Sequence, residues 1–158
     1  MTSQASRSHG IGAMRRMTLT TIILILGQSG LGVATNLYVT IPAHHSGAHP
    51  SNYFSGSASS VAWSVSHGAV ILAIHVVFGF AVALMVVATS IRLLTLGRPG
   101  VSIWALLGAL MVIGAGFNGA SFLDFSTNIS SLLMALLAFG AVACYTIVLI
   151  QLPVRAWQ

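Results

Sequence analysis

Charged side chains are nearly absent from this sequence. Among its 158 residues, only 4% are charged, and these comprise six basic residues and one acid. A soluble domain devotes about 25% of its residues to charge, which keeps its surface solvated. So few charges cannot coat a water-soluble particle of this size, and the shortage also excludes a disordered chain, which is typically rich in charge. The sequence therefore predicts a protein whose solvent is lipid, in keeping with its 56% hydrophobic residues.

Other residue types are also absent or rare, and this limits the catalytic and metal-binding chemistry open to the protein. The chain has no Lys and no Glu, its only acid is Asp124, and its only cysteine is Cys144. It therefore has no pair of acids for general acid–base catalysis and no lysine for a Schiff base or a phosphate-binding loop. A lone cysteine allows neither an intramolecular disulfide nor a cysteine-based zinc site. The composition favours a protein that is not an enzyme.

Four long apolar runs make up most of the chain. They cover residues 18–41, 69–91, 101–122 and 129–152, and the second has an apolar extension back to Val61. A hydrocarbon core of about 30 Å takes about 20 helical residues to cross, so each run is long enough. Within lipid, a helix satisfies its own backbone hydrogen bonds. The sequence predicts an all-α fold, a single four-helix membrane bundle over 18–152 with tails at 1–17 and 153–158.

The basic residues indicate an orientation rather than a nucleic-acid surface. The net charge is +5, and all six basic residues are arginines, which lie outside the apolar runs or at their ends, at positions 7, 15, 16, 92, 98 and 155. A nucleic-acid-binding protein clusters its basic residues on one face, which these positions do not predict. Short segments rich in Arg stay in the cytoplasm. We therefore expect both termini in the cytoplasm, a long outer loop between the first two helices, and no nucleic-acid partner.

The first run has a second interpretation. Arg15 and Arg16 precede an apolar stretch that continues to Gly32-Val33-Ala34, which is the order of a secretory signal with a small-residue cleavage site. The apolar stretch is longer than the 7–15 residues usual for such a signal, which favours a retained span. Cleavage would leave three spans.

Histidines and the lone acid gather on the predicted outer side. The candidate metal ligands are His44, His45, His49, His67 and Asp124. Neutral imidazole is the commonest metal ligand in proteins. A histidine set with one carboxylate suits copper or zinc better than magnesium or calcium. The spacing matches no closed zinc signature, so a solvated histidine loop is the competing interpretation.

His75 is a separate candidate, within the second apolar run. It follows His67 by eight residues, which places it about 12 Å further along a helix. Gly79 follows one turn later and leaves space, as a haem ligand would require. No second intramembrane histidine is present, so Met111 or Met134 would be the axial partner. The competing interpretation is a hydrogen bond from His75 to Asn36, Asn118 or a backbone carbonyl.

Three segments carry a resemblance to a known group of proteins. They are Ile41-Pro42-Ala43-His44-His45, Asn52-Tyr53-Phe54-Ser55-Gly56 and 115–123, which reads Ala-Gly-Phe-Asn-Gly-Ala-Ser-Phe-Leu. From Tyr38 to Ile150 the chain resembles an uncharacterised family of small four-helix integral membrane proteins of high-GC, actinobacterial-type bacteria. The resemblance implies a location in the bacterial plasma membrane and supplies no activity.

Three functions fit these observations. Small residues at close-packing spacing, such as Gly30 with Ala34 and Gly79 with Ala83, suit helix–helix contact. The leading hypothesis is thus a non-catalytic accessory or interaction subunit that contacts lipid and either other membrane subunits or further copies of itself. The alternative is a haem- or metal-binding protein that uses the histidines. The third is a small transporter or channel formed by oligomerisation.

Overall fold

The structure, a computed structural model, contains helices and connecting segments only. It describes residues 2–153, with side chains from Gly10 onward. The helices are α1 (Thr2–Tyr38), α2 (Tyr53–Ser66), α3 (Val70–Leu94), α4 (Pro99–Phe125) and α5 (Asn128–Gln151). Residues 154–158 of the expected C-terminal tail lie outside the described residues. The prediction of an all-α fold is confirmed.

Four of these helices are long and apolar enough to cross a membrane. They are α3, α4, α5 and the part of α1 from Gly10 to Tyr38, so the prediction of four spans is confirmed. The observed ends of α3, α4 and α5 lie within three residues of the predicted ones. In α1, the helix already begins at Thr2, although a tail was expected up to residue 17.

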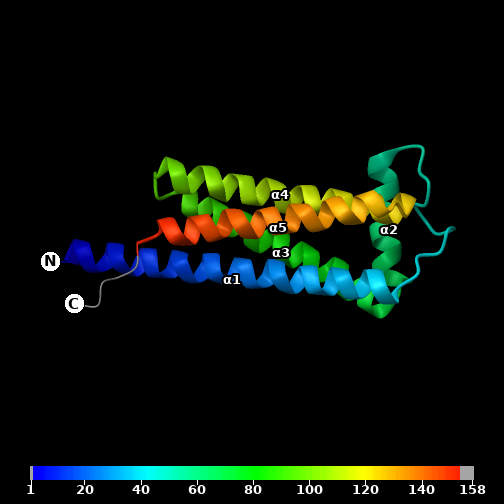
Figure 1. The fold of residues 1–158 in the computed structure, drawn as a ribbon, viewed down its shortest axis with the longest axis horizontal. Helices are drawn as coiled ribbons and strands as arrows, with labels where there is room; N and C mark the ends of the chain where they lie inside the picture. The colour runs from blue at the N-terminus through cyan, green and yellow to red at the C-terminus, as the bar shows by residue number, and fades with distance from the viewer. Residues whose placement is uncertain (1, 154–158) are drawn as a thin grey trace.

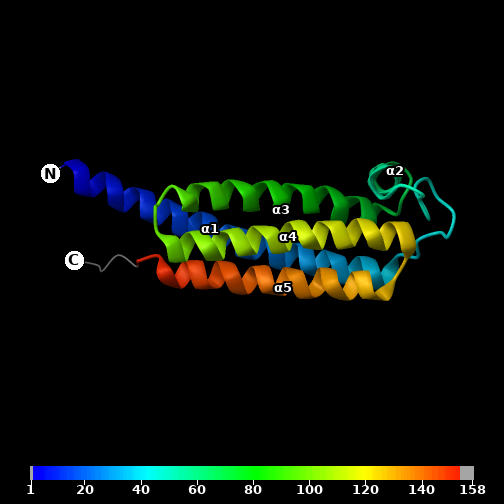
Figure 2. The ribbon, with the colours of Figure 1, turned by 90° about the horizontal axis from the view of Figure 1, so that it is seen from above.

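The long helices form a ring in which each one packs on two neighbours. α1 lies against α3 and α5, and α4 lies against the same two helices. Figures 1 and 2 show the four running side by side along the molecule. Each long helix is therefore next to the one that follows it in the chain, as in an up-and-down antiparallel bundle. We call the end where α1 begins and α5 ends the terminal end, and the opposite end the α2 end.

The short helix α2 differs from the predicted extension of the second span. It is separate from α3, because the chain turns at His67, Gly68 and Ala69. It runs across the direction of the long helices at the α2 end of the bundle (Figures 1 and 2). The side chain of Asn52 caps its first turn by accepting a hydrogen bond from the backbone N–H of Ser55. Asn is among the residues preferred at this position.

Hydrogen bonds between side chains tie the long helices together inside the bundle. The hydroxyl groups of Thr21 on α1 and Thr89 on α3 lie 2.9 Å apart, and both residues are buried. On α5, the Tyr145 hydroxyl lies 2.8 Å from Ser90 Oγ of α3. Ser90 also donates to the carbonyl oxygen of Ala105 on α4 at 3.2 Å. Such bonds between helices help to hold bundles together in lipid, where apolar burial does not drive association.

Two arginines bind the last carbonyl groups of α5 at the terminal end of the bundle. Arg15 of α1 donates through Nη1 to the carbonyl oxygens of Leu149, at 3.0 Å, and Leu152. Arg98, between α3 and α4, donates to the carbonyl oxygen of Gln151 at 3.3 Å. The last four carbonyls of a helix lack partners within it, and the helix dipole places partial negative charge there. The two guanidinium groups therefore fasten the end of α5 to its neighbours.

Candidate functional site

The lone acid of the chain is buried at the α2 end of α4. Asp124 is 1% exposed, and its Oδ2 accepts a hydrogen bond from the Ser57 hydroxyl of α2 at 2.7 Å. Its other carboxylate oxygen, Oδ1, has no hydrogen-bond partner among the described residues. No Arg or Lys occurs in the sequence between Arg16 and Arg92 or between Arg98 and Arg155. The Ser57 hydroxyl of α2 is therefore the hydrogen-bond partner of the Asp124 side chain among the described residues.

A second contact between α2 and α4 comes from Tyr53. Its hydroxyl donates to the carbonyl oxygen of Phe117 at 3.0 Å and lies 3.0 Å from Ser121 Oγ. Neither Tyr53 nor Ser57 was among the residues predicted from the sequence to form a site. Their signal in the sequence is the spacing of four residues, which places both side chains on one face of a helix.

His45 packs into the same region from the loop before α2. Its ring stacks on the Trp63 ring of α2, with centroids 4.3 Å apart. One ring nitrogen, Nε2, lies 3.1 Å from the carbonyl oxygen of Leu123, and the other lies 3.0 Å from the carbonyl oxygen of Ser46. Both nitrogens of this predicted metal ligand therefore face backbone oxygens.

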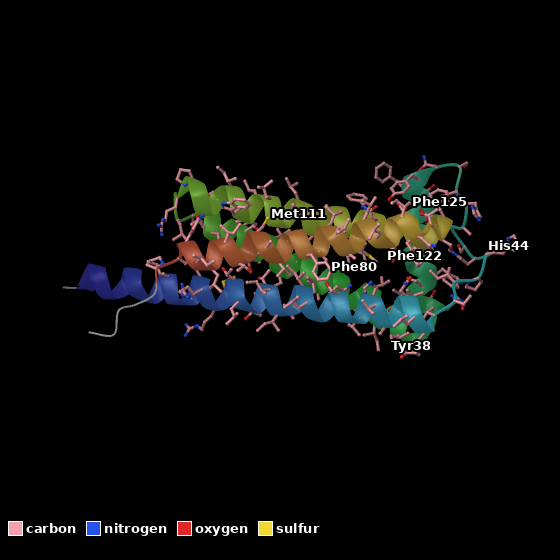
Figure 3. All side chains as sticks on the ribbon, viewed as in Figure 1. Tyr38, His44, Phe80, Met111, Phe122 and Phe125 are labelled. Atoms are coloured by element: carbon pink, nitrogen blue, oxygen red, sulfur yellow. The ribbon has the colours of Figure 1, made fainter. Side chains whose placement is uncertain are left out.

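The other predicted metal ligands at this end lie apart from one another. The backbone N–H of His49 donates to the carbonyl oxygen of Asp124 at 3.0 Å, while its ring meets Phe125 edge-on at 6.2 Å. The ring of His67, at the end of α2, lies 2.7 Å from Ser66 Oγ. His44 is exposed at the tip of the loop, away from the bundle (Figure 3). In the described part of the chain, no three His, Cys, Asp or Glu side chains form a group that could hold a metal ion.

A shallow cavity of about 470 Å³ lies on the surface of α2. Its lining residues come from one loop position and from the C-terminal half of α2. They are Ser46, Ser59, Ala62, Trp63, Ser66 and His67. Asp124 does not line it, so the buried carboxylate and this cavity are separate features.

His75 pairs with Gln28 across the interface between α3 and α1. Gln28 Nε2 lies 3.2 Å from His75 Nδ1 and donates to the carbonyl oxygen of His75 at 3.0 Å. The space expected beside the ring is filled. A Cβ on Gly79 would lie 2.9 Å from Gln28 Nε2, and one on Gly32 would lie 3.1 Å from His75 Cε1.

The partners expected for His75 lie elsewhere. Asn118 donates to the carbonyl oxygen of Gly114 in its own helix at 2.9 Å, and Asn36 is exposed. Met111 packs against Gly140, and Met134 packs against Gly119. Both methionines thus lie between α4 and α5, whereas His75 faces α1. The rotation of α1 against α3, which spacing within one helix does not specify, brings Gln28 to His75.

The glycines of the spans fall into two groups. Some lie where a neighbouring helix approaches closely: Gly32, Gly79, Gly108 and Gly140 face the side chains of His75, Gln28, Tyr145 and Met111. Gly30 on α1 and Gly116 on α4 are different, as are Gly10 and Gly12 near the start of α1, because a Cβ at any of these four positions would have no described atom within 4 Å. Of the four, Gly30 and Gly116 lie in the half of their helices nearer the α2 end, and both are exposed. The packing of the chain itself therefore does not require glycine at these two positions.

Comparison with known proteins gives no match among protein-family models, curated proteins or solved structures.

Proposed function

We propose that this small polytopic membrane protein lies in a bacterial plasma membrane with both termini in the cytoplasm. The described arginines support this orientation, because Arg15, Arg16, Arg92 and Arg98 belong to the terminal ends of α1, α3 and α4. Asp124, the only acid, belongs to the opposite end of α4. Arg and Lys are concentrated on the cytoplasmic side of membrane proteins.

Its proposed role is that of a non-catalytic accessory or interaction subunit in a larger membrane assembly. The observation that carries this role is the pair of open glycines, Gly30 and Gly116. Glycine within a helix costs about 1 kcal/mol relative to alanine. At Gly108 this loss is offset by the close approach of Tyr145, but no contact within the chain offsets it at Gly30 or Gly116.

The two open glycines lie at a similar depth. Gly30 is eight residues before the end of α1, and Gly116 is nine residues before the end of α4. A rise of 1.5 Å per residue places both about 12–14 Å from the α2 end of their helices. Small residues allow another helix to approach closely within the membrane. Because α1 and α4 make no contact within the described residues, the two glycines offer two separate faces to neighbouring helices.

The test is the mass of the particle extracted in a mild detergent, measured by light scattering during size-exclusion chromatography. We expect the unmodified chain to elute with partner subunits at a fixed ratio. Gly30→Leu and Gly116→Leu should release it as a single chain whose thermal stability is not lowered. Ala88→Leu, which adds the same side chain at an exposed position of α3, should leave the assembly intact. Elution of the unmodified chain as a lone monomer would contradict the proposal.

A further inference from the structure

The short helix α2 buries small residues and exposes an apolar stripe. Its buried residues are Gly56, Ser60 and Ser64. Its exposed residues are Phe54 and Val65, which are 73% and 46% exposed, together with Ala58 and Ala62, and with Ser55 and Ser66 at one edge of the exposed side. Positions 54, 58, 62 and 65 are four, four and three residues apart, which is the spacing of one continuous helical stripe. A helix facing water would have the opposite arrangement.

The inner face of α2 is directed toward the side of α4. Tyr53 reaches the carbonyl oxygen of Phe117, which lies eight residues before the end of α4 at Phe125. At 1.5 Å per residue, this contact is about 12 Å below the end of the helix. α2 also contacts α3, but it contacts neither α1 nor α5 within the described residues. The helix therefore lies along one flank of the bundle, as Figure 2 shows. The residues of its apolar stripe are exposed, so the stripe is on the side away from the bundle.

The level of α2 matches the boundary of a bilayer. α3 and α4 have 25 and 27 residues, which correspond to about 38 and 40 Å at 1.5 Å per residue. The hydrocarbon core is about 30 Å thick, so α4 extends about 5 Å beyond it at each end. α2 spans this boundary, because Ser57 binds Asp124 next to the end of α4 and Tyr53 reaches the Phe117 carbonyl about 12 Å below it. The start of α3 also exposes apolar side chains, with Val70 75% and Ile74 51% exposed.

We propose that the stripe of Phe54, Ala58, Ala62 and Val65 inserts into the boundary between the lipid headgroups and the acyl chains. Helices that lie in this plane bury their apolar face about 5–10 Å into the boundary. The other face is held by the bond from Ser57 to Asp124 and by the preceding loop, where Gly47 lies against Ser60 and Pro50 lies against Gly56. α2 thus anchors one flank of the bundle to a single leaflet. This inference is independent of the proposed subunit role and of the orientation of the protein.

The test places a fluorescent label at single cysteines in the purified full chain, reconstituted in lipid vesicles. Cys144 is the only cysteine and is buried, so Cys144→Ala supplies the background. Phe54→Cys and Val65→Cys place the label on the stripe. His44→Cys places it at the exposed tip of the loop, away from the bundle (Figure 3). One quencher is a lipid that carries a nitroxide high on its acyl chain, and the other is iodide in the water.

We expect the lipid nitroxide to remove most of the emission at positions 54 and 65 and little at 44. Iodide should act in the reverse order. Iodide quenching at 54 and 65 equal to that at 44 would overturn the inference, since the stripe would then face water and be open to a soluble partner. Protection of 54 and 65 from both quenchers would also overturn it, because a second copy of the chain would then cover the stripe.

Discussion

The hydroxyl of Ser57 donates a hydrogen bond to the carboxylate of Asp124, joining α2 to the end of α4 at 2.7 Å. This bond occupies one oxygen of a carboxylate that is almost fully buried, and it fixes a helix that has no contact with α1 or α5 in the part of the chain that the structure describes. The position of α2 against the bundle is therefore controlled by few contacts, each of which is open to mutation.

Ser57→Ala should destabilise the protein. The change leaves Asp124 Oδ2 buried without this donor, and a buried acceptor left without a partner costs about 1–3 kcal/mol. Unfolding of the purified protein in mixed detergent micelles measures the free energy directly. Ser59→Ala is the matched control, because the Ser59 hydroxyl donates to the carbonyl oxygen of Ser55 within α2 itself. Equal losses of unfolding free energy for Ser57→Ala and Ser59→Ala would show that the bond to Asp124 adds no stability of its own.

Tyr145→Phe removes the hydroxyl that links α5 to α3. The bond to Ser90 is buried, and such interhelical bonds average about 0.6 kcal/mol, with a maximum near 1.7 kcal/mol. We expect a loss in this range, and a smaller further loss when Ser90→Ala is added, because the two residues share one bond. If the stability losses of Tyr145→Phe and Ser90→Ala were fully additive in the double-mutant cycle, the two hydroxyl groups would not be bonded to each other.

Gly108→Ala and Gly116→Ala should act in opposite directions. A Cβ on Gly108 would lie 2.8 Å from Tyr145 Cε2 and 3.2 Å from Cys144 Cβ. Forcing α4 and α5 apart is a form of overpacking, which costs about 1–3 kcal/mol. At Gly116 the space is open, so alanine should raise the stability of the isolated chain by a few tenths of a kcal/mol up to about 1 kcal/mol. Thermal unfolding in detergent compares the stability of the two variants. Equal changes in stability would show that Gly108 and Gly116 do not differ in packing as described.

Arg15→Gln should loosen the end of α5 while leaving the spans in place. The substitution removes the guanidinium that binds the carbonyl oxygens of Leu149 and Leu152. Hydrogen exchange is the suitable measurement, and we expect faster exchange in the last turn of α5. Arg16→Gln is the control, because Arg16 is the exposed neighbour. Unchanged exchange in the Arg15 variant would show that the end of α5 is held by other contacts.

The four spans could be predicted from the sequence, whereas α2 could not. Long apolar runs predict membrane helices because lipid leaves few alternatives for the backbone. α2 is short, and its buried face consists of glycine and serine, which by themselves do not favour a helix. Its position depends on tertiary bonds from Tyr53 and Ser57 to α4, which local spacing does not specify.

Only part of the candidate site could be predicted from the sequence, because Tyr53 and Ser57 were not among the predicted residues. Asp124 and His45 could be assigned to one end of the molecule from the order of spans, and both lie at the α2 end of α4. The partner of His75 depends instead on how α1 is rotated against α3, which brings Gln28 to the ring rather than Asn36. Which glycines are open and which face a side chain also depends on the neighbouring helices. Gly30 and Gly32 are only two residues apart on α1, yet only Gly32 faces a side chain, that of His75.

The central claim is that other membrane helices pack on the faces around Gly30 and Gly116. The most direct measurement is photo-crosslinking in intact cells, with a photoreactive amino acid placed beside each glycine and both glycines kept. Val33, one turn after Gly30, and Ile113, one turn before Gly116, are 61% and 42% exposed. The account predicts adducts of one discrete larger mass at 33 and at 113, and none at Leu84, which is 73% exposed on α3. Absence of protein adducts at 33 and 113, or the same adducts at 84, would contradict the claim.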